Sequence, residues 1–96
     1  MKINEEEILK IYRSKFNDEE IFFHLIERIR LHEEKLKKLK KDKDKQEIFQ
    51  RELADLYLLS KVLLELEKVS DKTIKQSYEY YINKIKELFE NKNGKI

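Results

Sequence analysis

The sequence predicts an all-α fold, a four-helix antiparallel bundle built on a long hairpin of its second and third helices. Three observations predict it. The chain has one Gly and no Pro, so it lacks the residues that interrupt helices. Apolar residues recur at helical spacing, and there is almost none of the turn chemistry that joins strands. Short polar connections make successive helices antiparallel neighbours.

Four helices are expected in a single helical domain of residues 1–96, with polar residues where each begins. The expected ranges are about 5–16, 18–41, 45–68 and 71–91. The expected N-caps are Asn4, Asn17, Asp44 and Ser70. Glu20 and Glu47 follow the second and third of these caps by three residues, which is the spacing of a capping box. The segment NKNG, residues 91–94, is typical of a helix end.

Composition narrows the class of protein. The absence of Cys excludes disulfides and thiolate metal sites. Acidic residues stand near the start where a signal peptide would be apolar, and no uncharged run approaches the ~20 residues of a membrane span. We therefore expect a cytoplasmic protein without a membrane partner.

The charge pattern does not favour nucleic acid as a partner. A net charge of +2, from 22 basic and 20 acidic residues, selects no partner by bulk electrostatics. The densest basic run, KLKKLKKDKDK, is diluted by Asp42 and Asp44. Its lysines also complement the dipole at the end of a helix, which is reason enough for them.

The third helix is apolar around much of its circumference. A helix of this kind is usually central or lies in an oligomer interface. A bundle of 96 residues can hardly cover all of it. We therefore expect a homodimer, with Leu58, Val62 or Leu66 in the interface.

Two carboxylates interrupt the apolar stripe of this helix. Glu52 and Asp55 are three residues apart, so they project side by side and are close enough to share one cation. Burying both without a counter-charge is costly, and Mg²⁺ or Mn²⁺ would remove that cost. The alternative is a pair at the margin of the stripe, balanced by Arg51, Lys61 or a lysine of the second helix.

The segment ELADLYLLSKVLLE, residues 52–65, resembles the second signature of the MazG-like all-α nucleotide pyrophosphohydrolases. In that family an E-x-x-D pair in an E-L-(A/G)-D context begins an apolar helix, and acids on the preceding helix face it. The resemblance covers about residues 20–90. The first signature fits best at HLIERIRLHEE, where Glu27 takes the first acidic position. Arg28 and Leu31 replace the other two acids.

The resemblance implies a Mg²⁺ (or Mn²⁺) site made by Glu27, Glu52 and Asp55, with His24 as a further ligand. His32, Glu33 and Glu34 are alternative donors. The ion would hold a nucleoside triphosphate whose hydrolysis releases pyrophosphate.

On the fourth helix, the residues that correspond by position to the nucleotide-binding residues of the family are Asn83, Lys84 and Lys86. Whether the chain is an enzyme stays open, because two acids of the first signature are replaced. The alternative function is a non-catalytic helical module for dimerisation or protein interaction.

Overall fold

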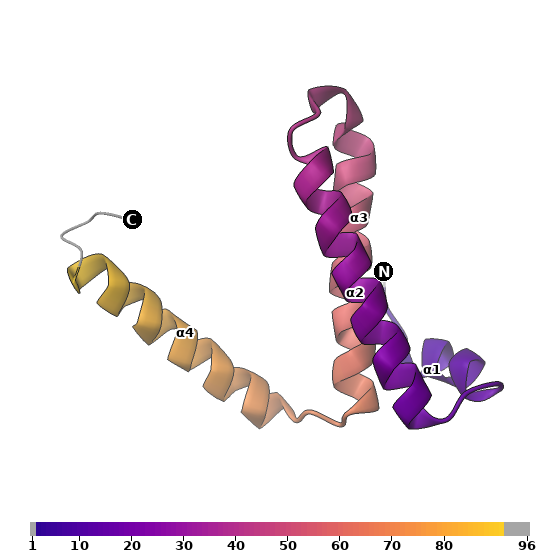
Figure 1. The fold of residues 1–96 in the computed structure, drawn as a ribbon. Coiled ribbons are helices and arrows are strands. Elements are labelled where there is room, and N and C mark those ends of the chain that lie inside the picture. The colour runs from indigo at the N-terminus through magenta and orange to yellow at the C-terminus, as the bar shows by residue number, and fades with distance from the viewer. Residues whose placement is uncertain (1, 92–96) are drawn as a thin grey trace.

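The computed structural model describes residues 2–91, and this part of the chain consists of helices and connecting turns without a strand. The elements are α1 (Glu5–Arg13), α2 (Asp18–Leu39), a short 3-10 turn η1 (Lys43–Lys45), α3 (Gln46–Leu66) and α4 (Asp71–Asn91). The helices α2 and α3 run antiparallel, side by side, and α1 packs across the open end of this hairpin (Figure 1). The predicted all-α class and the hairpin at its centre are confirmed.

The buried core lies where α1 meets the hairpin. Its side chains are Leu9 of α1, Ile21 and Leu25 of α2, and Val62 and Leu66 of α3. The two α3 residues are 1% and 6% exposed, so they do not lie on the outer surface where the sequence had suggested a dimer interface. The reason is that α1 contributes a third apolar wall on this side of α3.

The capping box predicted for the second helix is present. Asn17 Oδ1 accepts the backbone N–H of Glu20 at 2.8 Å, and the Glu20 carboxylate accepts the N–H of Asn17 at 3.0 Å. The box predicted at Asp44 is absent, because the chain first makes η1, whose N-cap Asp42 accepts the N–H of Asp44 at 3.1 Å. The helix α3 then begins without a side-chain cap.

A hydrogen-bonded cap ends α3 and sets the direction of the chain that leaves it. Lys68 adopts the left-handed conformation with φ of 54°. Its N–H bonds the Glu65 carbonyl at 3.1 Å, and the N–H of Val69 bonds the Leu64 carbonyl at 3.0 Å. This pair of bonds is a Schellman motif. Ser70 then caps α4 as predicted, since its Oγ accepts the N–H of Thr73 at 3.2 Å.

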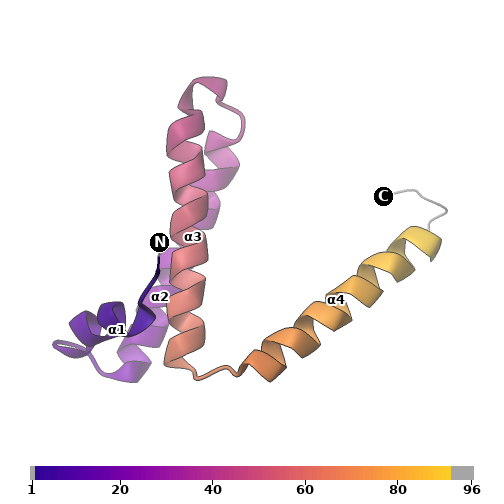
Figure 2. The ribbon, with the colours of Figure 1, turned by 180° about the vertical axis from the view of Figure 1, so that it is seen from behind.

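Beyond this elbow, α4 extends away from the other helices (Figures 1 and 2). It contributes no residue to the buried core. The radius of gyration is 16.9 Å, whereas a compact chain of this length has about 12.5 Å. The three-helix body and α4 are therefore two arms joined at residues 67–70.

Three of the four helices are slightly shorter than the sequence predicts, and the fourth has the predicted bounds of 71–91. The first ends at Arg13, and the hydroxyl of the next residue, Ser14, donates to the Ile11 carbonyl at 2.6 Å. The second and third lose one or two residues at their ends. Residues 92–94 of the predicted helix end lie outside the described residues. Each helix within residues 2–91 is too short or too polar to span a bilayer.

Candidate metal centre

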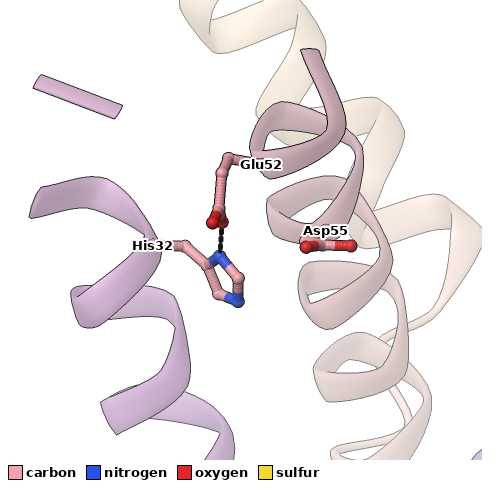
Figure 3. A group of neighbouring side chains, drawn as sticks. All are labelled: His32, Glu52 and Asp55. Carbon is pink, nitrogen blue, oxygen red and sulfur yellow. Dashed lines mark hydrogen bonds and ion pairs between the residues drawn. The ribbon is translucent and has the colours of Figure 1, made fainter. Parts of the chain in front are cut away.

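His32, Glu52 and Asp55 form a group of possible metal ligands between the two long helices (Figure 3). One ligand atom from each residue lies within 4.8 Å of the others. The His32 ring points from α2 toward the Glu52 carboxylate on α3, and the two are hydrogen-bonded through Nδ1 and Oε2. The side chains of His32 and Glu52 are 7% and 13% exposed. Asp55 is half-buried beside them.

Helical periodicity explains why these side chains meet. His32 follows the buried Leu25 by seven residues, two turns along the same face of α2. Asp55 precedes the buried Val62 by seven residues, and Glu52 is one turn further from the core. The core side chains orient both helices. The three polar groups lie on the same faces as these core side chains, nearer the turn of the hairpin.

Two groups of α2 contact the carboxylate of Glu52. His32 hydrogen-bonds one carboxylate oxygen, and Lys35 Nζ lies 3.7 Å from the other. The ammonium group of Lys35 is on the surface, with its side chain 59% exposed. A buried carboxylate with such partners escapes most of the cost of desolvation. Glu52 therefore has polar partners in the folded chain without a cation.

Glu27 does not belong to this group. Its side chain is 56% exposed on another face of α2, and Arg30 donates to both of its oxygens, at 2.6 and 3.1 Å. The hydrogen bond from Arg30 lowers the pKa of Glu27 below its usual value. Arg30 also binds Glu34 at 2.8 Å. The carboxylate of Glu27 is thus held in a surface network.

The other residues implied by the resemblance are also apart from the group. His24 is exposed, and its ring lies 5.2 Å from that of Tyr12, centroid to centroid, where it helps to join α1 to α2. Asn83, Lys84 and Lys86 are exposed on α4, which leaves the body of the molecule.

The sequence predicts His32 only as an alternative donor, although it contains a signal for this residue. His32 occupies a position in the apolar stripe of its helix, whereas Glu27 does not. A polar residue in a stripe faces the neighbouring helix, and here that neighbour presents Glu52. Facing positions, rather than similarity to a motif, would have selected it.

One imidazole nitrogen and two carboxylates from facing helices are a donor set that suits a divalent transition metal. Three protein ligands leave coordination positions for water or a substrate oxygen. Comparisons with protein-family models, curated proteins and solved structures find no match for this chain.

Proposed function

We propose that this chain binds a divalent cation at His32, Glu52 and Asp55 and acts on nucleotide phosphates as a divergent MazG-like pyrophosphohydrolase. The observation that carries the proposal is the convergence of three donor groups within 4.8 Å from both helices of the hairpin. Two of these donors belong to the E-L-A-D segment on which the resemblance rests.

The donor set favours Mn²⁺ over Mg²⁺. Mg²⁺ prefers oxygen ligands in near-ideal octahedral geometry. Mn²⁺ accepts an imidazole nitrogen more readily than Mg²⁺ does, although less strongly than Zn²⁺. Ligands of an octahedral ion with bonds of 2.1 Å are about 3.0 Å apart when adjacent and about 4.2 Å apart when opposite, and the ligand atoms here lie within 4.8 Å of one another. The spacing therefore fits one ion after small side-chain rotations.

Each residue has a distinct part in this proposal. Glu52 and Asp55 bind the cation, and His32 supplies a nitrogen where the family supplies an acid. Lys35, 3.7 Å from Glu52 and largely exposed, is placed to contact a phosphate oxygen. The cation, when bound, would neutralise phosphate charge and activate a water molecule.

Thermal unfolding with and without Mn²⁺ tests cation binding. A cation that binds only the folded chain stabilises it by ~2.7 kcal/mol at a hundredfold excess over its Kd. For a chain of this size, Tm should then rise by roughly 10 °C or more. The double substitution Glu52→Gln with Asp55→Asn should abolish the rise. Glu27→Gln should keep it, because Glu27 is held by Arg30 on another face.

Hydrolysis is tested separately by measuring pyrophosphate released from each nucleoside triphosphate with Mn²⁺. Release by the wild type that is lost in the Glu52→Gln, Asp55→Asn variant supports the proposal. If Mn²⁺ leaves the wild-type Tm unchanged and no pyrophosphate appears, the enzyme proposal fails.

A second candidate is a non-catalytic helical module for dimerisation or protein interaction. Two observations favour it. His32 and Lys35 already contact the Glu52 carboxylate without a cation, and the apolar face of α4 is exposed. In this case the three polar groups fix the pairing of α2 with α3. Assembly as a homodimer and a cytoplasmic location are part of both proposals.

A further inference from the structure

The helix α4 carries an unpartnered apolar face. Six large side chains recur at helical spacing along it, and each is between 42% and 66% exposed. They are Ile74, Tyr78, Tyr81, Ile85, Leu88 and Phe89. A continuous stripe of this kind, unlike scattered apolar residues, marks a surface that is covered in the functional state.

A second unpartnered stripe lies on α3. Leu53 and Tyr57 are 45% and 58% exposed, and Leu64 continues the same face. By helical spacing this face is about half a turn from Val62 and Leu66, which point into the core. The outer side of α3 is therefore apolar as well, and neither α1 nor α2 covers it.

The two stripes meet at the elbow and then separate. An open groove at the elbow is lined mainly by apolar atoms of Leu64 and Val69 from one side and Ile74, Tyr78 and Tyr81 from the other. Beyond the groove α3 and α4 diverge (Figures 1 and 2). Within one chain, the far parts of both stripes stay in water.

We propose that a second copy of this chain covers both stripes, with α4 of each copy packed along the outer face of α3 of the other. Both helices have 21 residues and are therefore about 31 Å long, so each is long enough to lie along the stripe of the other. In a twofold dimer each copy offers one α3 face and one α4 face, and all four are filled. A different protein would have to provide both complementary faces itself.

The exposed area is sufficient for a stable dimer. A large side chain buries about 150–250 Å² when fully covered, so six half-exposed ones offer on the order of 600 Å². With the α3 face added, two copies together reach the ~1,600 Å² of a standard interface.

Charge does not oppose this arrangement. The helix α3 carries Glu47, Glu52, Asp55 and Glu65 against Arg51 and Lys61, which is a small negative excess. In α4 four lysines balance four acidic residues. The whole chain has a net charge of only +2, so two copies repel each other weakly.

The test is the mass in solution of the full chain and four variants, by sedimentation equilibrium over a range of concentrations. The wild type should have twice the 11.9 kDa mass of the chain. Ile85→Asp places a charge on the α4 stripe and should raise the dimer Kd by roughly a hundredfold or more, since the symmetry buries that charge twice. Gln76→Asp is the control, because Gln76 is exposed and lies on the opposite side of α4 by helical spacing. It should stay dimeric.

Leu53→Asp separates this arrangement from a dimer made by α4 alone. It should also produce monomers, and mixing it with Ile85→Lys should restore a dimer, because one of the two α3–α4 contacts is then unmodified. Circular dichroism confirms that each variant keeps its helices.

Three results would overturn the inference. The first is a wild type that stays monomeric at about 100 µM. The second is an Ile85→Asp variant that remains dimeric, and the third is a Leu53→Asp variant that dimerises like the wild type. A monomeric wild type would mean that α4 folds back on its own α3 or meets another protein. The inference does not rest on the metal proposal, because mass and the effect of Mn²⁺ are measured independently.

Discussion

The hairpin of α2 and α3 and the lone helix α4 are built from the same kind of sequence but end in different surroundings. All three helices have 21 or 22 residues and an apolar stripe. In the hairpin, Ile21 and Leu25 meet Val62 and are fully or almost fully buried. In α4, every large apolar side chain of the stripe is exposed. An amphipathic pattern thus indicates that one face of a helix will be covered. It does not identify the surface that covers this face.

The polar groups repeat this contrast. Glu52 lies in the hairpin between His32 and Lys35, and its surroundings are fixed by two helices. Lys84 of α4 lies over a ring of its own helix, with its Nζ 5.8 Å from the Tyr80 ring centroid. A site requires facing elements, and among the described residues the hairpin provides them.

The largest effect expected is the loss of a core side chain. Ile21→Ala should cost about 2–5 kcal/mol, because it leaves a cavity at a fully buried position. Ile85→Ala, the same change on α4, should stay within about 0.5 kcal/mol when protein is dilute enough to be monomeric. Denaturant unfolding followed by circular dichroism measures both. Equal losses would show that α4 is part of the same cooperative unit.

The next largest effect concerns the buried pair in the hairpin. His32→Ala should destabilise the chain by about 1–3 kcal/mol, because the Glu52 carboxylate loses its buried hydrogen-bond partner. His24→Ala serves as control, since His24 is exposed, and it should cost less. Thermal unfolding without added metal gives the comparison. If both substitutions reduce stability by the same amount, the His32–Glu52 hydrogen bond contributes nothing specific to the stability of the fold.

The N-caps give a third comparison. Asn17→Ala removes the capping box of α2 and should cost about 1 kcal/mol, or a Tm lower by roughly 4–8 °C. Ser70→Ala removes the cap of α4. It should reduce the helical signal at low temperature and leave the main transition of the monomer in place. If both substitutions shift the main transition equally, α4 unfolds together with the three-helix body.

The smallest effect expected comes from two acids where α1 meets α3. A hydrogen bond with Glu6 raises the pKa of Glu65 above its ordinary value of 4.5. The folded chain therefore holds this proton more tightly than the unfolded chain, and stability falls as pH rises from 4.5 through the raised pKa. At neutral pH, Glu65→Gln should raise Tm slightly. Below that window the gain should vanish, and a gain that persists in acid would refute this explanation.

The sequence by itself determined the local structure. Four helices, the capping box at Asn17 and the cap at Ser70 follow from side chains that bond their own backbone within a few residues. The projection of Glu52 and Asp55 from one face of α3 also follows from spacing alone. The failure at Asp44 is local too, because Asp42 competes for the same turn and its side chain is the one that bonds the backbone.

Only the tertiary structure decided which residues face one another. The resemblance selected Glu27, but α2 is oriented by Ile21 and Leu25 against the core, and this orientation turns His32 toward Glu52. Likewise α1, through Leu9, takes Val62 and Leu66 into the core of the single chain. The rotation of a helix about its axis is set by the sum of its apolar contacts with other helices, and a motif on one helix contains no information on that sum.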